Sequence, residues 1–427
     1  MRNNPRTHGL WERSAPEPAP TSALQGDART DVAVVGAGFT GLSAALHLAE
    51  GGARVTVLEA VEIGFGASGR NVGLVNAGMW VMPDDLPGVL GQTHGDRALA
   101  LLGAGPGAVF DLVRRHAIAC EADQRGTLHC AVGARGLDEL RERERQWQAR
   151  GAPVRLLDAD ETRRRVGTGA YAGSLLDERA GTIQPLAYAR GLGAAAIRAG
   201  AIVHTGSPVV SAEDDGSSWL LRTPDGTLRA GAVVVATDAY TVGVWPQIRT
   251  QQVMLPYFNL ATAPLGDNLR RSVLPGGEGV WDTKEILSSF RMDAQGRLVF
   301  GSVGALRGPG RAIHRDWGRR ALARLFPQLG DVGFEHEWYG QIGMTRDNVP
   351  RFHRLGRNVV AFSGYNGRGI APGTVFGRCL AQLLLGTVRE DELPLPVSDP
   401  RTLRGRVVRG AYYEVGAQVA HLAGERF

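Results

Sequence analysis

The chain of 427 residues has few cysteines and no long apolar run. Cys120, Cys130 and Cys379 are too few for a disulfide framework, and neither they nor the histidines have metal-ligand spacing, so we expect reduced thiols and no metal site. No apolar run approaches the roughly 20 residues of a membrane span, and residues 1–26 lack the apolar core of a signal peptide. We therefore expect a cytoplasmic protein without a membrane partner, in which residues 1–26 form an irregular arm.

Lysine is nearly absent from a chain whose formal net charge is +5, because Lys284 is the single lysine among 48 basic residues. The arginines are dispersed along the chain. Basic and acidic residues alternate over 141–145, and Glu139 and Arg143 form an i,i+4 pair. Both patterns are typical of a solvated helix face. The sequence therefore predicts no nucleic-acid partner.

The segment from Asp31 to Ala60 has the pattern of a nucleotide-binding βαβ unit. The apolar run Val32 to Val35 predicts a buried strand, and a helix with apolar periodicity follows it up to the glycines at 51–52. Between the strand and the helix lie three glycines at GxGxxG spacing: Gly36, Gly38 and Gly41. They permit a tight turn, a close approach of pyrophosphate, and close packing of helix on strand. The segment therefore predicts a dinucleotide whose phosphates lie at a helix N-terminus.

Glu59 ends the second strand of this unit, Arg54 to Leu58. A carboxylate there accepts hydrogen bonds from the adenosine ribose hydroxyls and disfavours the 2′-phosphate of NADP. A fused NAD-plus-FAD reductase would need a second glycine fingerprint after a strand, and the sequence has none. The single fingerprint near the N-terminus favours FAD as the resident cofactor.

The rest of the chain alternates between two kinds of pattern. Residues 92–150 are predicted to be mostly helical, and a second αβ passage begins at Pro185 with a helix to about Ala199. Further predicted elements are strands at 201–204 and 208–212, a hairpin of 219–223 with 227–230, a buried strand at 232–236, and a hairpin of 290–292 with 298–300. A last apolar strand at 358–363 leads through a glycine-rich turn into an apolar helix near Pro372.

These patterns predict an α/β plus α+β protein with two interleaved domains. We expect a doubly wound Rossmann domain for FAD from residues 27–91, 160–245 and 340–427. We expect an antiparallel-sheet substrate domain from residues 92–159 and 246–339.

Four further motifs accompany the fingerprint: GFGASGRNVG at 64–73, VVVATDAY at 233–240, FRMDAQGRLVFG at 290–301 and GYNGRG at 364–369. Together they resemble the FAD-dependent oxidoreductases of the D-amino-acid oxidase and sarcosine oxidase superfamily and, within it, the γ-glutamylputrescine oxidases most closely. The resemblance implies noncovalent FAD and oxidation of an amine C–N bond by hydride transfer to flavin N5. Water would hydrolyse the imine, and oxygen would reoxidise the flavin and release hydrogen peroxide. The implied partners are a small-molecule amine and oxygen.

The resemblance also implies which residues form the site. The small-residue loop at 68–71 would pass the pyrophosphate and ring, and the turn at 364–369 would direct a helix N-terminus and Arg368 toward the flavin N1–C2=O edge, which gains negative charge on reduction. The expected FAD-binding residues are Gly36, Gly38, Gly41, Glu59, Ser68, Arg70, Asn71, Val210, Ala236, Gly364, Gly367, Arg368 and Gly369. The expected catalytic residues are Arg70, Lys284 and Arg368.

Lys284 is expected at the start of a substrate-domain strand, where its ammonium could stabilise superoxide as oxygen accepts an electron. A lysine at the surface of a strand edge is the alternative.

The chain departs from the superfamily at three places and lacks the cysteine by which some relatives attach flavin. Val72 precedes Gly73 where two glycines are usual, Ala371 stands where relatives hold a substrate carboxylate with lysine, and Val299 aligns with their oxygen-activating lysine. The stretch 340–344 has no cysteine for covalent flavin attachment. We therefore expect primary or secondary amines, such as diamine derivatives, rather than small α-amino acids, with Arg70 or Arg368 available for an acidic substrate group.

Two other functions remain open at this point. One is a dehydrogenase that passes electrons to a quinone or an electron-transfer protein. The other is a flavoprotein that acts on modified RNA or serves in assembly.

Overall fold

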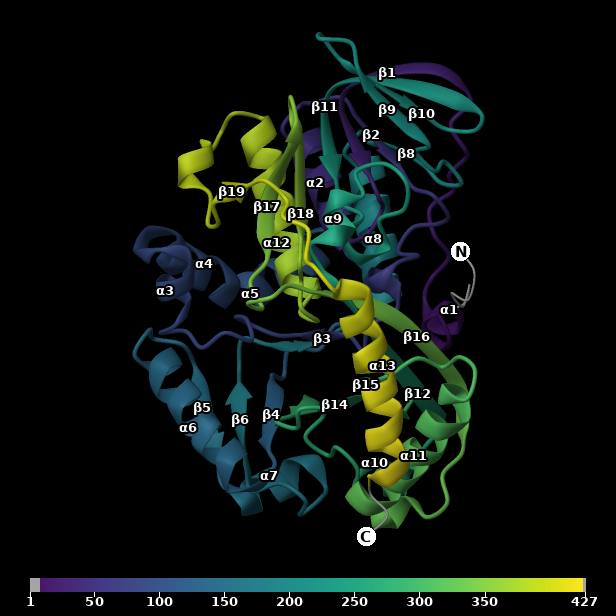
Figure 1. Ribbon diagram of the computed structural model, residues 1–427. Coiled ribbons are helices and arrows are strands. Elements are labelled where there is room, and N and C mark those ends of the chain that lie inside the picture. The colour runs from purple at the N-terminus through teal and green to yellow at the C-terminus, as the bar shows by residue number, and fades with distance from the viewer. Residues whose placement is uncertain (1–7, 425–427) are drawn as a thin grey trace.

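A computed structural model describes residues 8–424 and contains two large sheets, a nine-stranded one in the upper half of Figure 1 and an eight-stranded one in the lower half. A short sheet of β3 (Leu74–Val75) and β7 (Gly181–Thr182) accompanies them. This architecture confirms the predicted fold class. Within residues 8–424, no helix combines the length and the apolar composition that crossing a membrane requires.

The nine-stranded sheet has a parallel centre. Its main path runs β19, β17, β18, β11, β1, β2, β8, and β10 and β9 extend it from β11. The strands are β1 (Gly26–Val35), β2 (Val55–Leu58), β8 (Ile202–His204), β9 (Ser211–Asp214), β10 (Trp219–Arg222), β11 (Gly226–Val235), β17 (Arg351–Gly356), β18 (Val359–Ser363) and β19 (Val397–Ser398). All four residues of β2 are buried, as expected for a strand covered on both faces.

Three helices pack together on the nine-stranded sheet: α2 (Phe39–Glu50), α8 (Pro185–Arg198) and α12 (Ile370–Leu384). The contact between α12 and α2 is close because α12 carries glycines there. A Cβ atom at Gly373 would lie 3.1 Å from the Cβ of Phe39. This packing brings the start of α12 beside the start of α2, although the two helices are separated by most of the chain.

The eight-stranded sheet runs in the order β16, β12, β15, β14, β13, β4, β6, β5. The strands are β4 (Thr127–Ala131), β5 (Val154–Leu157), β6 (Gly173–Asp177), β12 (Val253–Pro264), β13 (Gly279–Asp282), β14 (Ser288–Met292), β15 (Arg297–Val303) and β16 (Phe334–Met344). The longer helices around it are α6 (Gly133–Gln148), α7 (Ala159–Val166), α11 (Gly310–Leu325) and α13 (Arg406–Ala423), and α4 (Gln92–Gly103) and α5 (Gly105–Arg115) lie nearer the other sheet. The remaining helices are α1 (Leu10–Ser14), α3 (Leu86–Leu90), α9 (Gln247–Thr250) and α10 (Asp267–Arg270).

Both predicted hairpins are confirmed. In the first, β10 pairs antiparallel with the start of β11, with Trp219 opposite Ala230. In the second, β14 pairs antiparallel with β15, with Phe290 opposite Phe300. The buried strand predicted at 232–236 is the end of β11, which pairs in parallel with both β1 and β18.

Several predicted elements were wrong in detail. The stretch 92–150 contains β4 between its helices, and because all five residues of β4 are buried, the strand lacks the alternation that would have revealed it. The strand placed at 208–212 is β9, which begins at Ser211, and the helix placed near Pro372 is α12, which begins at Ile370. Lys284 lies in the loop between β13 and β14, not at the start of a strand.

The expectation of an irregular N-terminal arm was wrong for residues 10–14, which form α1. Trp11 is fully buried, and its ring centroid lies 5.4 Å from that of Trp338 in an edge-on contact. Arg190 of α8 fixes the arm from the other side, because its guanidinium lies 2.6 Å from the carboxylate of Glu12. Residues 1–7 of the predicted arm lie outside the described residues.

The expected domain limits remain a prediction, but the sheets do not follow them everywhere. The expected boundary at residue 160 would place β6 with the Rossmann domain, whereas β6 pairs with β4 and β5 in the eight-stranded sheet. The limit at residue 340 falls inside β16, which pairs with β12 along its length.

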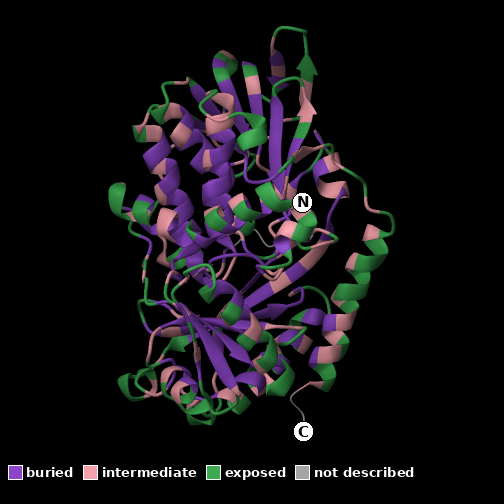
Figure 2. Cartoon of the chain, turned by 90° about the vertical axis from the view of Figure 1, so that its left-hand side faces the viewer, coloured by how far each residue is buried: buried purple, intermediate pink, exposed green. Residues whose placement is uncertain are grey.

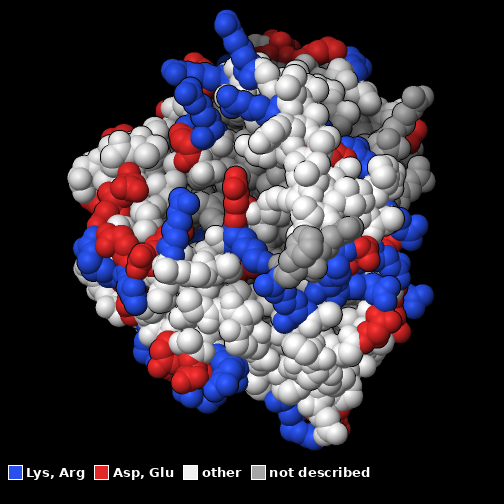
Figure 3. Space-filling view, turned by 60° about the horizontal axis from the view of Figure 1, so that its bottom comes forward, with Lys and Arg blue, Asp and Glu red and all other residues white. Residues whose placement is uncertain are grey.

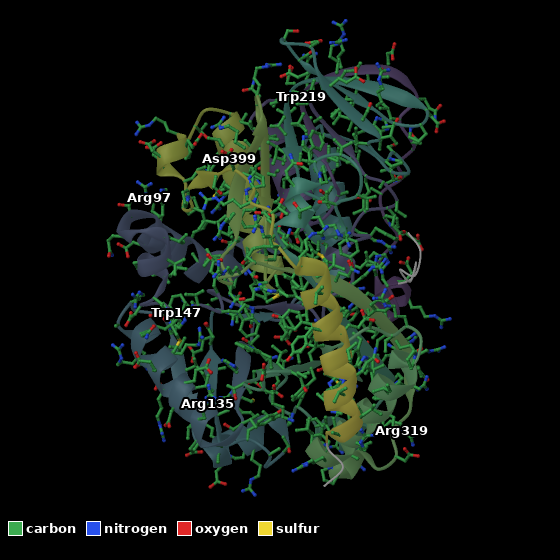
Figure 4. All side chains as sticks on the ribbon, in the orientation of Figure 1. Arg97, Arg135, Trp147, Trp219, Arg319 and Asp399 are labelled. Carbon is green, nitrogen blue, oxygen red and sulfur yellow. The ribbon has the colours of Figure 1, made fainter. Side chains whose placement is uncertain are left out.

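Charged side chains are spread over the surface, as Figure 3 shows for one face, where basic and acidic groups are interspersed around a hollow. Two of the peripheral arginines labelled in Figure 4 illustrate how they are held. Arg319 of α11 pairs with Asp331, and Arg97 of α4 donates a hydrogen bond of 2.5 Å to the carbonyl oxygen of Asp391. The absence of a nucleic-acid partner stays a prediction.

Candidate active site

A cavity of about 850 Å³ lies where the two sheets meet. The nine-stranded sheet contributes the carboxyl ends of its central parallel strands, at Val35, Leu58 and Val235, which is where such sheets bind nucleotides. The eight-stranded sheet contributes Tyr257 and Trp281. The cavity therefore joins a nucleotide-type strand edge to a wall of the antiparallel sheet.

The glycine turn fits a pyrophosphate for three separate reasons. Gly36 has a φ of +104°, and a Cβ there would lie 2.9 Å from the carbonyl oxygen of Ala236. A Cβ on Gly38 would lie 2.8 Å from the hydroxyl of Ser68, and one on Gly41 would overlap the carbonyl oxygen of Gly36. Gly36, Gly38, Ser68 and Ala236 line the cavity, whereas Gly41 lies behind it and sets how closely α2 packs on the turn.

Glu59 lies where the ribose acid is expected. Its carboxylate is buried and accepts hydrogen bonds from the backbone N–H groups of Ala37, at 2.7 Å, and Val61, at 3.0 Å. Burial raises the pKa of Glu59, and the backbone hydrogen bonds act in the opposite sense. Val210 also lines this end of the cavity, but its side chain is exposed.

The loop at 64–73 follows the cavity wall. Arg70 is buried, its Nε donates a 2.9 Å hydrogen bond to the carbonyl oxygen of Phe65, and its guanidinium carbon lies 4.7 Å from the Phe65 ring centroid. Burial lowers the pKa of Arg70. The Asn71 amide donates to the carbonyl oxygen of Ser68 at 3.0 Å and accepts from the N–H of Gly73 at 2.9 Å, which closes the loop on itself.

Two tryptophans hold this loop from behind, and the sequence motifs did not identify either. The indole N–H of Trp11 donates to the carbonyl oxygen of Asn71 at 2.8 Å, and that of Trp338 donates to the carbonyl oxygen of Arg70 at 3.0 Å. Val299 is packed in the same cluster and does not line the cavity. The position that aligns with an oxygen-activating lysine is therefore part of the core in this chain.

The turn before α12 is held by Asp238. The N–H of Gly364, which has a φ of +86°, donates to the Asp238 carboxylate at 2.9 Å. Burial raises the pKa of Asp238 to about 6. Gly364 itself does not line the cavity, whereas Gly367 and Gly369 do. Asp238 belongs to a motif quoted for the resemblance, but nothing in the sequence assigned it this contact.

Arg368 lies in an aromatic enclosure on the cavity wall. Its guanidinium carbon is 4.8 Å from the ring centroid of Trp281 and 5.0 Å from that of Trp80. The ring of His129 stacks on that of Trp281, with the ring centroids 3.4 Å apart. One guanidinium nitrogen donates to the carbonyl oxygen of Ala77 at 2.7 Å.

Arg368 is also a buried cation without a carboxylate. Its side chain is 8% exposed, its Nε has no hydrogen-bond partner, and among residues 8–424 no acidic side chain forms an ion pair with it. Burial lowers the pKa of Arg368 to about 9. By contrast, Arg291, which is buried even more deeply, lies 3.2 Å from the carboxylate of Glu121.

The remaining expected positions also lie on the cavity. Lys284 lines its rim but is exposed, and its backbone N–H donates to Asp282 at 3.2 Å. Val72 and Ala371 line the wall, and the match of Ala371 to a substrate-clamping lysine stays a prediction. The roles predicted for Arg70, Lys284 and Arg368 stay predictions.

Comparison with known proteins gives consistent matches over most of the chain. The sequence model of the family described as FAD dependent oxidoreductase (DAO) matches residues 31–383. Gamma-glutamylputrescine oxidoreductase of Escherichia coli (strain K12) is 34% identical over 428 residues, which cover 96% of this chain and 98% of that protein. Two solved structures share the fold. Glycine oxidase from Geobacillus kaustophilus has a TM-score of 0.69 at 21% identity, covering 85% of this chain and 96% of that one. L-proline dehydrogenase from P. horikoshii has a TM-score of 0.69 at 18% identity, covering 87% and 98%.

Proposed function

The chain belongs to the DAO family of FAD-dependent oxidoreductases, as its motifs predicted, and we propose that it oxidises the C–N bond of an amine with oxygen as electron acceptor. It is an enzyme, and its cofactor is FAD. The observation that supports the proposal is the single cavity that joins the dinucleotide turn to the aromatic enclosure around Arg368.

The residues on the nucleotide side fit FAD by their chemistry. Glu59 would accept hydrogen bonds from the ribose hydroxyls, and the N-terminus of α2 would face the pyrophosphate with its positive end. None of the three cysteines lines the cavity, which supports noncovalent binding. When bound, FAD would supply the hydride acceptor for oxidation of the carbon next to a neutral amine; the imine would be hydrolysed by water, and oxygen would take the two electrons to give hydrogen peroxide.

The chain itself would position the amine and exclude water. Tyr257, Trp80 and Trp281 line the substrate side with large, mostly apolar surfaces, which suit the methylene chain of an amine. A strong general base is unnecessary if the amine binds in its neutral form. Ala371 in place of a clamping lysine supports primary or secondary amines, including diamine derivatives, over small α-amino acids.

Arg368 would hold an acidic group at the far end of such a substrate. Burial of a guanidinium without an anion is costly, and a carboxylate would satisfy it with charge-assisted hydrogen bonds. The Escherichia coli relative is named for γ-glutamylputrescine, an amine that carries a carboxylate, and we propose a compound of this class for the present chain. The alternative role for Arg368 is to stabilise negative charge on the reduced flavin.

The acceptor is tested by separating the two half-reactions. Purified protein is expected to be yellow and to release free FAD on acid precipitation, and γ-glutamylputrescine is expected to bleach the flavin without air and to yield peroxide with air. Bleaching without peroxide would identify a dehydrogenase, and salt-sensitive RNA binding with no bleaching by any amine would favour the nucleic-acid alternative. Bleaching by glycine or sarcosine alone would reject the substrate class.

Lys284 is the proposed group for the reaction with oxygen. Lys284→Met is expected to slow reoxidation of the flavin by more than about twofold, which is roughly 0.4 kcal/mol in the barrier, and to leave flavin reduction unchanged. If reoxidation is also unchanged, the step depends on other groups, such as Arg70 or Arg368.

A further inference from the structure

The last helix, α13, carries an apolar stripe on its exposed side. Five side chains with exposures from 45% to 73% form the stripe: Val408, Tyr412, Val415, Val419 and Leu422. Figure 2 shows this helix at the edge of the molecule, with most of its length exposed. Isolated exposed apolar residues are ordinary, but a continuous row on one helix marks an interaction surface.

The opposite side of α13 is anchored to the protein, so the stripe is held in a fixed position. His421 is buried and stacks on Trp317 with the ring centroids 3.8 Å apart. The Nδ1 atoms of His421 and His314 are 2.8 Å apart, which is a hydrogen-bond distance. Glu414 accepts a 2.9 Å hydrogen bond from the guanidinium of Arg307 on the same side. Because these contacts occupy the inner face, the stripe cannot turn inward without breaking them.

The spacing of the stripe indicates what covers it. Its members are separated by four, three, four and three residues, which is the a/d repeat by which two helices pack along a seam. A surface helix with no helical partner normally has a polar outer face. Here the positions that flank the stripe are mostly small or uncharged, such as Ala411, Gly416 and Gln418, and Arg409 is the charged exception. Depletion of charge with tyrosine present is the composition of an interface centre.

We propose that α13 is the two-fold interface of a homodimer in which the stripe packs against the same stripe of a second copy. A two-fold interface is self-complementary. Because Val415 lies midway between Val408 and Leu422, it would contact Val415 of the second copy whether the two helices run parallel or antiparallel. A helix of 18 residues is about 27 Å long and would bury roughly 1,000 Å² over both partners, the lower limit for a specific interface. The seam alone is therefore sufficient for a weak dimer, and it could also form the centre of a larger interface.

The test compares Val415→Glu with a matched control on the same helix. Val407 is 72% exposed, like Val408, but lies about 80° from Val415 around the helix axis and outside the repeat. At micromolar concentration, the FAD-loaded protein is expected to sediment at twice its chain mass of 45.5 kDa. Val415→Glu is expected to weaken the dimer by at least about tenfold, because the seam would bury an unpaired charge, whereas Val407→Glu is expected to leave it unchanged.

Cross-linking distinguishes a self-paired seam from any other contact. All three native cysteines are buried, so Val415→Cys would introduce one exposed thiol, which is expected to form a disulfide dimer under mild oxidation. Val407→Cys is expected to remain monomeric on a denaturing gel. A monomeric wild-type protein, a dimer that Val415→Glu does not weaken, or equal weakening by Val407→Glu would each overturn the proposal.

Discussion

Replacing Arg368 by methionine removes one buried cation of the cavity and keeps a long apolar side chain beside Trp80 and Trp281. Arg368 has no acidic partner among residues 8–424. The substitution therefore breaks no ion pair within the protein. The protein is therefore expected to fold and to retain FAD. The variant should lose the binding energy that the guanidinium contributes to the substrate carboxylate, both in the bound substrate and in the transition state.

The size of the loss follows from the burial of the guanidinium. A hydrogen bond to a charged group is worth about 1.5–3 kcal/mol, and Arg368 is 8% exposed, so solvent screens it little. At about 1.4 kcal/mol per tenfold change, kcat/KM for a carboxylated amine should fall roughly 10- to 150-fold. An amine without the carboxylate gains nothing from the guanidinium, and its kcat/KM should change by less than about threefold.

The assay is the ratio of kcat/KM for γ-glutamylputrescine to that for 4-aminobutyrylputrescine, which has the same amine tail, amide and second amino group but no carboxylate. Arg179→Met is the control for loss of an arginine on a tryptophan outside the cavity: its guanidinium lies 4.4 Å from the Trp147 ring centroid, and the substitution also removes an ion pair of 2.7 Å with Asp177. An equal loss for both substrates, with a lowered flavin potential, would refute substrate binding and assign Arg368 to the flavin. Failure of both amines to reduce the wild-type flavin would instead refute the proposed reaction.

Three further predictions concern cofactor binding and stability. Gly41→Ala is expected to abolish FAD retention, measured as flavin absorbance per chain, while Gly107→Ala, where a Cβ meets nothing within 4 Å, should retain it. Trp11→Ala is expected to cost about 3–5 kcal/mol of stability and to weaken FAD binding, read by thermal unfolding with and without added FAD. Burial lowers the pKa of His314 to about 4 and that of His421 to about 3. Between pH 6.5 and about 4, therefore, these histidines take up protons only in the unfolded state. Lowering the pH over this range should destabilise the packing of α13 by up to about 1.4 kcal/mol per pH unit for each histidine. Hydrogen exchange in α13 should lose this pH dependence when His314→Gln and His421→Gln are combined, and an unchanged dependence would contradict it.

The parts that the sequence predicted correctly depend on local spacing. The βαβ unit that carries Gly36, Gly38, Gly41 and Glu59 was recognisable because its strands, turn and helix follow one another directly along the chain. The hairpins were predictable for the same reason, since turn residues join strands that pair directly. Such features are encoded over fewer than about 35 residues, as in one βαβ unit.

The parts that the sequence did not predict depend on contacts between distant segments. The enclosure of Arg368 brings together Trp80, His129 and Trp281, which lie in separate elements. Trp11 supports the loop of Asn71 across 60 residues of chain, and no local periodicity records such a contact. The strand β4 was missed because complete burial removes the alternation that distinguishes a strand from a short helix.

The interleaving of the two sheets has a consequence for synthesis on the ribosome. The acid that would hold the ribose is at position 59, whereas the turn that completes the cavity, with Arg368, emerges about 310 residues later, which at roughly 5–20 residues per second takes about 15–60 s. Before that, β1 lacks its neighbour β11 until residue 235 has emerged, and β11 in turn lacks β18 until residue 363 has emerged. Flavin capture is therefore expected late, after most of the chain has left the ribosome, and a prematurely terminated chain should remain without cofactor and be open to proteolysis.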